Sequence, residues 1–505
     1  MRRVLSLALA CAAPLAAAPA AQAAAARACD TPTRGWQRVA PAAAGLDARK
    51  LDQAIHSYQD RRGYAVRVYR RGCLVGTDTN SGWTGRAQFE GWGITRALTS
   101  LLVGRAMELG ALDPEDPVGA LVPQADAAHG AIRVKDLLTL TSGLRAGGLR
   151  DEELVDRDGL HDALVTEVAH RPGARFHESV GAGALLVAVL EAAVGEDLQA
   201  FAQGELLGPL GVRPGAWRWE RDRAGRVNGA YGATMIADDF ARLGELLRRG
   251  GVWEGRRLLG ERYVREALTP SDANPCLGWL VWVNAGTRCT RTEDGERTTV
   301  QDRLLPGSPA DVWQFRGRFD QFVLVFPALE LMVVRTGTRG GDSRSGEDGG
   351  TWERGVALQL LDAVRDATPQ RTAIRRDARV EQSRPQDGQG RGSDLFGPWF
   401  PPPLPPAGPY RARAVALDQP ATSVGRRRLV PVGVRCPARS ARPCDVELRV
   451  DDGRAPAPFA VVPGTRQVVR VRVVKGTLPR TVALRAVSRD EAGGTTTSLP
   501  LTLTR

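Results

Sequence analysis

The segment GWGITRAL, residues 91–98, opens an apolar stretch that predicts a buried helix. Gly93 and Arg96 stand three residues apart, so in a helix they lie on one face. Gly93 has no side-chain atom that could act as a nucleophile. The guanidinium of Arg96 stays protonated, so it cannot act as a general base. Neither residue can therefore supply the reactive group that the first turn of a helix often presents.

Other segments follow this helix in a recognisable order. They are LDPEDPV (112–118), IRVKDLLTLTSGL (132–144), PGARF (172–176), GPLG (208–211), MIADDFARLG (235–244) and VVRTG (333–337). Each segment alone is a weak signal of a family, but the order in which the segments occur is a specific one. Together they resemble the serine β-lactamase and DD-peptidase superfamily, in particular the branch of class C-like esterases and 6-aminohexanoate-dimer hydrolases. The resemblance covers about Pro41 to Val364.

This resemblance implies an α+β fold in which an antiparallel sheet is flanked by helices and accompanied by a helical subdomain. It also implies three catalytic motifs, of which the first, Ser-x-x-Lys, is replaced by Gly93 and Arg96. In relatives the lysine amine helps to deprotonate the serine hydroxyl. The sequence therefore predicts that this route of catalysis is lost.

The second and third motifs of the family also differ. Tyr-x-Asn is expected two residues after Phe176, where this chain has Glu178 and Val180. A shifted register would use His177 and Ser179, which again lack the phenol. The third motif, Lys or His before x-Gly, corresponds to Phe315-Arg316-Gly317 and keeps only the glycine.

No other lysine can restore the first motif. The chain has lysine only at positions 50, 135 and 475, and the residues three places before them are Asp47, Ile132 and Arg472. No Ser-x-x-Lys therefore occurs anywhere in the sequence. In relatives the lysine and tyrosine are neighbours across the cleft, which suggests that Arg96 and Glu178 pair with each other. A buried arginine without a partner is costly, so we expect this ion pair to fill the former site.

Other nucleophiles have weaker support. Thr95 and Thr99 lie in the same helix, where threonine hydroxyls usually bond backbone carbonyls, and Ser142 fits a turn. No G-x-S-x-G or H-E-x-x-H occurs. Of the five histidines, only His177 is expected near the cleft; the full set is His56, His129, His161, His170 and His177.

The N-terminus has the pattern of a secretory signal peptide. Arg2 and Arg3 precede an apolar run that reaches the small-residue site Ala21-Gln22-Ala23. We expect residues 1–23 to be removed and the protein to be secreted or held at the cell surface. Lipidation at Cys11 is an alternative with a poor local pattern. No later apolar run is long enough to span a membrane.

Six cysteines remain after the signal, an even number in an exported chain. Proximity in sequence favours disulfides between Cys276 and Cys289 and between Cys436 and Cys444, which leaves Cys29 for Cys73. A metal site is the alternative, but no paired C-x-x-C supports it. No cofactor is predicted.

The formal net charge is +12 and the pI is about 9.9. A positive charge of this size favours binding to anionic envelope polymers. The simpler explanation of the charge is a composition rich in arginines that are dispersed over the surface and solvated. No specific nucleic acid is predicted as a partner.

Domain boundaries follow from composition and periodicity. Residues 30–366 form the hydrolase-like domain, with strands expected at 64–75, 312–315, 321–326 and 331–335 and helices at 46–59 and 351–364. Residues 367–409 read as a linker that contains the proline run 401–406. Alternating segments such as 446–450 and 468–473 predict an Ig-like β-sandwich at 410–505.

Three functions are compatible with these patterns. The first is an inactive relative that binds a cell-wall peptide or a small acyl ligand in its cleft. The second is an active hydrolase or esterase with a relocated nucleophile. The third is an adhesion or wall-binding protein that acts through the C-terminal sandwich, with the large domain as a scaffold.

Overall fold

The computed structural model describes the large domain almost continuously and the C-terminal region by its strands. The described residues are 28–57, 65–79, 81–145, 150–293, 296–318, 321–337, 352–375, 379–383, 416–418, 429–435, 444–450, 453–454, 459–461, 466–473, 480–490 and 493–503. The expected signal peptide, Cys11, Cys436 and the proline run 401–406 lie outside them. Within the described part, no helix has the length and apolarity needed to cross a membrane.

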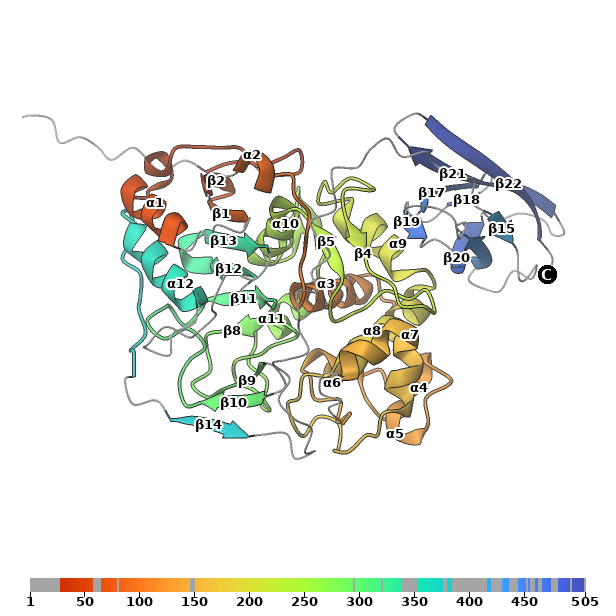
Figure 1. The fold of residues 1–505 in the computed structure, drawn as a ribbon, viewed down its shortest axis with the longest axis horizontal. Coiled ribbons are helices and arrows are strands. Elements are labelled where there is room, and N and C mark those ends of the chain that lie inside the picture. The colour runs from red at the N-terminus through yellow and green to blue at the C-terminus, as the bar shows by residue number, and fades with distance from the viewer. Residues whose placement is uncertain are drawn as a thin grey trace, which may run out of the picture.

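A six-stranded antiparallel sheet forms the centre of the large domain (Figure 1). Its order is β2-β1-β13-β12-β11-β8. The strands are β1 (Ala65–Arg70), β2 (Cys73–Thr77), β8 (Trp282–Val283), β11 (Trp313–Arg316), β12 (Phe322–Phe326) and β13 (Leu331–Thr336). Every residue of β1, β12 and β13 is buried, because helices cover both faces. The strands expected from the sequence in this region are therefore confirmed.

The two faces of this sheet are covered by different helices. Helices α1 (Ala48–Ser57) and α12 (Trp352–Ala363) pack together on one face (Figure 1), where Leu51 and Ile55 lie against Gly76. Helix α10 (Ala237–Arg248) packs on the other face, with Gly244 against Val323. The helices near the two ends of the domain thus share one face, as the sequence predicts.

The helical subdomain packs around α3 (Ile94–Glu108), which contacts α8 (Val180–Val194), β11 and α11 (Glu261–Ala267). Its other helices are α4 (Val118–Leu121), α5 (Ala127–Gly130), α6 (Val134–Leu138), α7 (Arg150–Val165), α9 (Leu198–Ala202) and the π-helix η2 (Gln203–Leu207). Short elements complete the domain: η1 (Pro41–Ala44), α2 (Ser81–Thr84) and η3 (Pro327–Leu329).

Within the described part of the large domain, three small sheets lie outside the central one. They are β3-β5-β4, the β6–β7 hairpin and β14-β10-β9. Their strands are β3 (Phe89–Glu90), β4 (Arg218–Trp219), β5 (Ala233–Met235), β6 (Val252–Trp253), β7 (Arg256–Arg257), β9 (Cys289–Glu293), β10 (Glu296–Val300) and β14 (Val380–Ser383).

Strand β14 corrects one part of the predicted linker, residues 367–409. Val380 pairs with Val300 and Ser383 with Arg297, so this segment adds a strand to the β9–β10 hairpin. The strand has only four residues and one apolar side chain, so backbone hydrogen bonds rather than a hydrophobic pattern define it.

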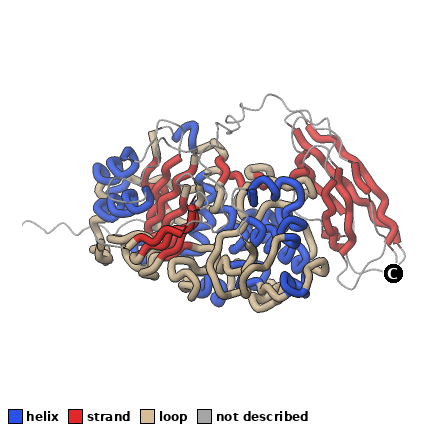
Figure 2. Tube along the Cα trace, turned by 60° about the horizontal axis from the view of Figure 1, so that its bottom comes forward, coloured by secondary structure: helices blue, strands red, loops and turns tan. Residues whose placement is uncertain are grey.

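The described C-terminal strands form two four-stranded antiparallel sheets (Figure 2). One has the order β15-β16-β20-β18 and the other β19-β17-β21-β22. Their bounds are β15 (Ala416–Asp418), β16 (Leu429–Arg435), β17 (Cys444–Val450), β18 (Gly453–Arg454), β19 (Phe459–Val461), β20 (Arg466–Val473), β21 (Arg480–Asp490) and β22 (Gly493–Leu503). Val432, Val434 and Val446 are buried, as the alternating pattern predicts for a sandwich core.

Candidate functional site

Helix α3 begins where the family's nucleophile would stand. Gly93 is its N-cap residue and makes no side-chain cap. From Ile94 to Ala106, Arg96 is the one residue of the helix that is not buried. The preceding residue, Trp92, has φ of 47°, a left-handed conformation that is uncommon for a bulky side chain. The start of α3 therefore has no side chain at position 93 and a guanidinium at position 96, and the indole of Trp92 lies directly before the helix.

The end of β11 lies directly against this turn. A Cβ atom on Gly93 would stand 2.5 Å from the carbonyl oxygen of Arg316 and 3.3 Å from Cα of Gly317. A Cβ on Gly317 would stand 2.4 Å from the carbonyl oxygen of Gly91. Both positions need glycine because the two backbones approach so closely. The position that corresponds to the nucleophile thus has no room for a serine side chain.

The expected ion pair between Arg96 and Glu178 is present. Nη1 of Arg96 donates a hydrogen bond to Oε2 of Glu178, just before helix α8. The two side chains are 20% and 16% exposed, so both are largely removed from water. The sequence-based hypothesis is confirmed, and Glu178 rather than the shifted alternative His177 faces Arg96.

A second ion pair fixes the strand that carries the third motif. Nε of Arg316 donates to Oε1 of Glu353 on α12 at 2.8 Å. Arg316, together with Arg291, holds the pKa of the buried Glu353 carboxyl down to about 2, although burial alone would raise it. Glu353 is therefore ionised throughout the physiological range, and the pair anchors β11 to α12 at neutral pH.

Aromatic and cationic side chains surround the start of α3. The guanidinium carbon of Arg318 lies 5.9 Å from the ring centroid of Trp92, within the range of a cation–π contact. On the other side, the rings of Trp92 and Tyr231 are 6.4 Å apart. Trp92 thus links the start of α3 to the segment after β11 through Arg318 and to the segment before β5 through Tyr231.

The remaining nucleophile candidates make structural contacts. Thr99 Oγ1 donates to the carbonyl oxygens of Thr95 and Gly229, each at 3.0 Å. Thr95 Oγ1 accepts from the backbone nitrogen of Ala233 at 3.2 Å. Ser142 is 2% exposed and accepts from the backbone nitrogen of Leu144. All three hydroxyls support backbone geometry, as expected from their local sequence.

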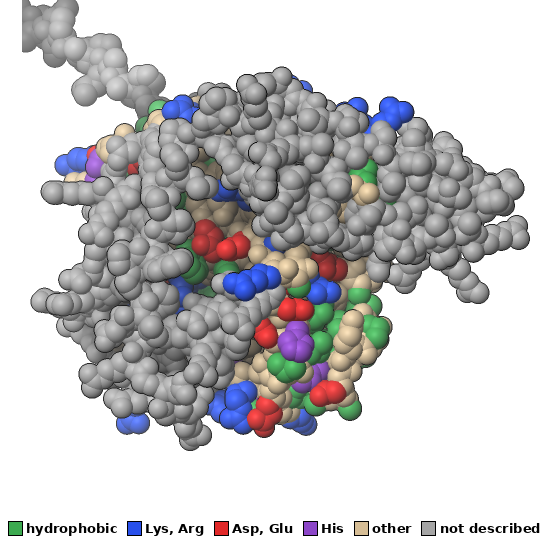
Figure 3. Space-filling view, turned by 45° about the vertical axis from the view of Figure 1, so that its right-hand side comes forward, with side chains coloured by type: hydrophobic (Ala, Val, Ile, Leu, Met, Phe, Trp, Pro, Cys, Tyr) green, Lys and Arg blue, Asp and Glu red, His purple; other side chains and the backbone are tan. Residues whose placement is uncertain are grey.

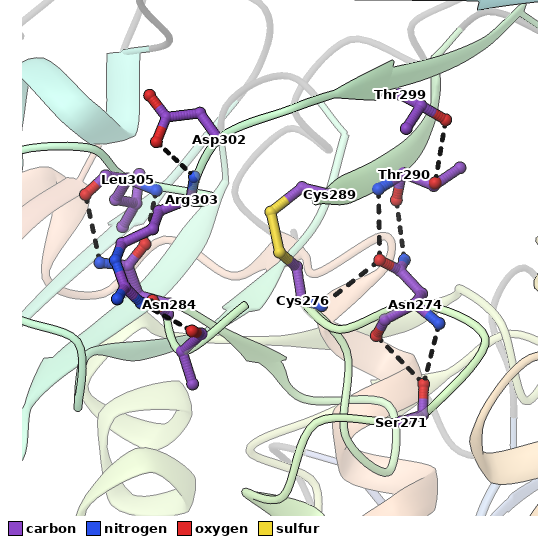
Figure 4. Close-up of a disulfide and its surroundings, with 11 residues drawn as sticks. Ser271, Asn274, Cys276, Asn284, Cys289, Thr290, Thr299, Asp302, Arg303 and Leu305 are labelled. Atoms are coloured by element: carbon purple, nitrogen blue, oxygen red, sulfur yellow. Dashed lines mark hydrogen bonds between the residues drawn. A yellow bond between two sulfur atoms is a disulfide. The ribbon is translucent and has the colours of Figure 1, made fainter. Parts of the chain in front are cut away.

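Two of the expected disulfides are present. Cys29 bonds Cys73 and ties the N-terminal segment to β2. Cys276 bonds Cys289, with the buried Asn274 side chain donating to the carbonyl oxygen of Thr290 beside it (Figure 4). The third expected pair, Cys436 with Cys444, includes a residue that lies outside the described part of the chain. The described part of the chain contains no group of three or more His, Cys, Asp or Glu side chains placed for a metal.

One ionisable group was not singled out from the sequence. Glu191, near the end of α8, lines a cavity of about 280 Å³ together with Leu160, Asp197 and Arg226. Burial, and then the carboxylate of Asp197, raise the pKa of Glu191 to about 7. Asp197 itself is fully engaged, because Arg221 donates to both of its oxygens at 2.8 and 2.9 Å. Asp197 is only six residues away from Glu191, whereas Leu160 and Arg226 come from distant segments, so the local sequence does not show that Glu191 is buried.

Comparison with known proteins assigns the large domain to a family. The family model described as Beta-lactamase matches residues 51–357, more than half of the chain. The chain belongs to the β-lactamase family. A search of curated proteins found no significant match.

Solved structures that resemble this β-lactamase family member are distant in sequence. A candidate β-lactamase from Bacteroides dorei is 16% identical with a TM-score of 0.51, and the match covers 63% of this chain and 99% of that one. A candidate 6-aminohexanoate-dimer hydrolase from Bacillus anthracis is 13% identical, with a TM-score of 0.49 and coverage of 62% and 85%. A penicillin-binding protein homologue from Caulobacter crescentus is 16% identical, with a TM-score of 0.47 and coverage of 62% and 95%. At this identity, the first of these structures supports the fold alone.

Proposed function

We propose that this member of the β-lactamase family does not hydrolyse acyl substrates and acts as a binding or interaction module. The observation that carries the proposal is the contact between the end of β11 and the start of α3. A side chain at position 93 would collide with the carbonyl oxygen of Arg316, 2.5 Å from its Cβ. A covalent acyl-enzyme at this position has neither an attacking atom nor the space to form.

The charges around Gly93 support the same proposal. An acylation site needs a base that can release and accept a proton near neutral pH. A guanidinium has donors and no acceptor atom, and the Arg96 guanidinium donates a hydrogen bond to Glu178. The charged groups of the site therefore neutralise each other as an ion pair, and they do not form a relay for proton transfer.

The compartment and the ligand class are further parts of this proposal. Two disulfides favour an oxidising environment outside the cytoplasm, in agreement with the expected signal peptide. We propose that a cell-wall peptide or a small acyl ligand binds without being cleaved, near the half-buried rings of Trp92 and Tyr231. Aromatic rings of this kind provide contact area at low cost in conformational entropy.

Intact-mass spectrometry tests the proposal directly. The purified chain is exposed to a β-lactam and, separately, to a fluorophosphonate, with an active serine β-lactamase as the positive control. We expect no added mass on this chain under conditions that label the control fully. Stoichiometric labelling would instead support the relocated-nucleophile alternative, and peptide mapping would then identify the residue.

A further inference from the structure

The cavity that Glu191 lines lies beside the C-terminal half of α8, and we call it the α8 pocket. Its volume is about 280 Å³. Glu191 stands about 17 Å along the helix axis from Val180, the first residue of α8, because a helix rises 1.5 Å per residue. Glu178, which pairs with Arg96, lies just before that first residue. The α8 pocket is therefore separate from the cleft of the family, and the function proposed above makes no use of it.

Part of the lining of the α8 pocket is apolar. The apolar side chains that the argument uses come from α4, the residue after it, α7 and α8; they are Leu121, Val122, Leu160, Ala188 and Ala192. A ligand body packed against them gains about 25 cal/mol for each Å² of apolar surface removed from water. At about 30 Å³ for each water-sized group, the pocket has room for roughly nine non-hydrogen atoms. The pocket thus fits a small organic molecule.

The charged part of the lining favours a positive charge. Among the described residues, the carboxyl groups of Glu191, Glu196 and Asp197 and the guanidinium of Arg226 line the pocket. Asp197 already has a partner, because Arg221 donates to both of its oxygens. Glu191 lies in the last turn of α8, where the helix carbonyl groups carry partial negative charge. The end of the helix and the Glu191 carboxylate therefore attract a cation to the same place.

The carboxylate of Glu191 has no close cationic partner. Its Oε1 accepts a hydrogen bond from the backbone nitrogen of Leu198 at 3.2 Å. Its Oε2 is 3.7 Å from Nε of Arg226, which is longer than a hydrogen bond. That Nε is buried and has no hydrogen-bond partner among the described residues. The Glu191 side chain is 22% exposed, so Oε2 is left for a donor that enters from solvent.

Surface carboxylates of the large domain have closer partners. On the face in Figure 3, acidic and basic side chains are interspersed, and neither sign forms a continuous patch. Glu167 is 2.5 Å from Arg145, and Asp113 is 3.0 Å from Arg262. A cation gains little at such exposed pairs, because a guanidinium is already there and water screens the charges. Glu191 differs from them in its burial and in the distance to its arginine.

We propose that the α8 pocket binds a small organic cation, namely a primary ammonium group on a short apolar body. The ammonium group donates to Oε2 of Glu191 at the carbonyl end of α8, and the apolar body packs against Leu160 and Ala188. An ammonium group has three donors and no acceptor, which suits a carboxylate oxygen. A carboxylate ligand would reach Arg226 instead, but it would bring a further negative charge next to Glu191 and Asp197.

Titration calorimetry of the full chain at pH 8 tests the proposal with three probes, pentylamine, pentanol and pentanoate. The probes share an unbranched apolar chain and differ in the charge of the end group. We expect pentylamine to bind at least about tenfold more tightly than the other two, because only an ammonium group forms a charge-assisted hydrogen bond with Glu191. Tighter binding of pentanoate would assign the pocket to anions through Arg226 and would overturn the proposal. The absence of pentylamine binding at millimolar concentration would also overturn it.

The affinity for pentylamine should rise about tenfold between pH 6 and pH 8. The pKa of Glu191 is about 7, so its ionised fraction rises from about one tenth to about nine tenths over this range. The amine stays protonated, as a lysine side chain does with a pKa of about 10.4. The other charged groups around Glu191 are Glu196, Asp197, Arg221 and Arg226. An affinity that does not change with pH would mean that Glu191 does not bind the ammonium group.

Two variants separate the charge of the pocket from its space. Glu191→Gln should weaken pentylamine binding at least about tenfold and remove the pH dependence. Ala192→Leu keeps every charge and fills the pocket, so it should also abolish binding. The control Glu261→Gln removes the same charge from α11, where the side chain is 81% exposed and outside the lining. This control should bind pentylamine like the unaltered chain, and equal weakening in the Glu191 and Glu261 variants would overturn the proposal.

Discussion

The carbonyl oxygen of Arg316 lies 2.5 Å from the place where a Cβ of Gly93 would stand. At position 93 the chain has therefore lost two things, the nucleophilic side chain and the space that such a side chain would need. A chain that had lost only its serine could regain activity by one or two substitutions. Here β11, which carries the third motif, lies against the start of α3, which carries the first. A serine at position 93 would therefore also require β11 to move.

Restoring the family motif should therefore not restore acylation. We expect the variant Gly93→Ser/Arg96→Lys to remain unlabelled by a β-lactam or a fluorophosphonate in intact-mass measurements. Its free energy of unfolding should fall by about 1–3 kcal/mol, because the new side chain forces β11 away from α3. Gly82→Ala is the control, since a Cβ there meets nothing within 4 Å and should change stability by less than about 1 kcal/mol. Efficient labelling of the restored variant would contradict this prediction.

The ion pair of Arg96 with Glu178 should couple the two residues energetically. Arg96→Met or Glu178→Leu alone leaves one charge largely buried without its partner, and should cost about 1–3 kcal/mol after allowance for partial exposure. The double variant should recover most of this loss, because an apolar pair of similar volume replaces the charged one. A double-mutant cycle by chemical denaturation measures this coupling. Strictly additive losses would mean that the pair contributes nothing.

Several features of this site could be predicted from the sequence because they depend on residue type. Arg96 and Glu178 occupy positions that face each other in the family, and an arginine removed from water needs a carboxylate. The cysteines at 276 and 289 are close enough in sequence to pair, as they do. Strand β12 and the first four residues of β13 are continuous apolar runs, which is typical of a sheet covered on both faces.

Other features depend on contacts between distant backbones and have no local pattern. The carbonyl oxygen of Arg316 approaches Gly93 because β11 ends next to the start of α3, and the types of these residues do not predict where the strand ends. Strand β14 is short and polar, and it is defined by its pairing with β10. The burial of Glu191 depends on Leu160 and Arg226, which are distant from it in the sequence.

Glu191 should make stability depend on pH near neutrality. Its pKa is about 7 in the folded chain and 4.5 ordinarily, so the folded state keeps a proton that the unfolded state has already lost. Stability should therefore decrease as the pH rises from about 4.5 to about 7 and then level off. Glu191→Gln removes this decrease and should stabilise the chain at pH 8 by on the order of 1–3 kcal/mol. Denaturation curves at several pH values measure the effect.

The control for this pH dependence is a carboxyl with the opposite shift. The pKa of Glu353 is depressed to about 2, so its contribution is present above about pH 4.5 and is lost as the pH falls toward 2. Glu353→Gln should destabilise the chain at pH 8 by leaving Arg316 without its anion, in contrast to the Glu191 variant. If both variants changed stability in the same direction at pH 8, the buried environment assigned to Glu191 would be wrong.

The two disulfides should contribute unequally to stability, since they close loops of different length. Cys29 and Cys73 are 44 residues apart, and Cys276 and Cys289 are 13 apart. On the chain-entropy model the longer loop contributes about 4 kcal/mol and the shorter about 3 kcal/mol. The Cys29 bond also holds residues 31–33 against α10 and its surroundings, where Arg242 donates to the carbonyl oxygen of Pro32 at 3.1 Å. Paired serine variants, compared by thermal unfolding, should therefore show the larger loss for Cys29→Ser/Cys73→Ser, together with proteolytic cleavage of the N-terminal segment. A larger loss for Cys276→Ser/Cys289→Ser would mean that the N-terminal segment is held by its packing and not by its disulfide.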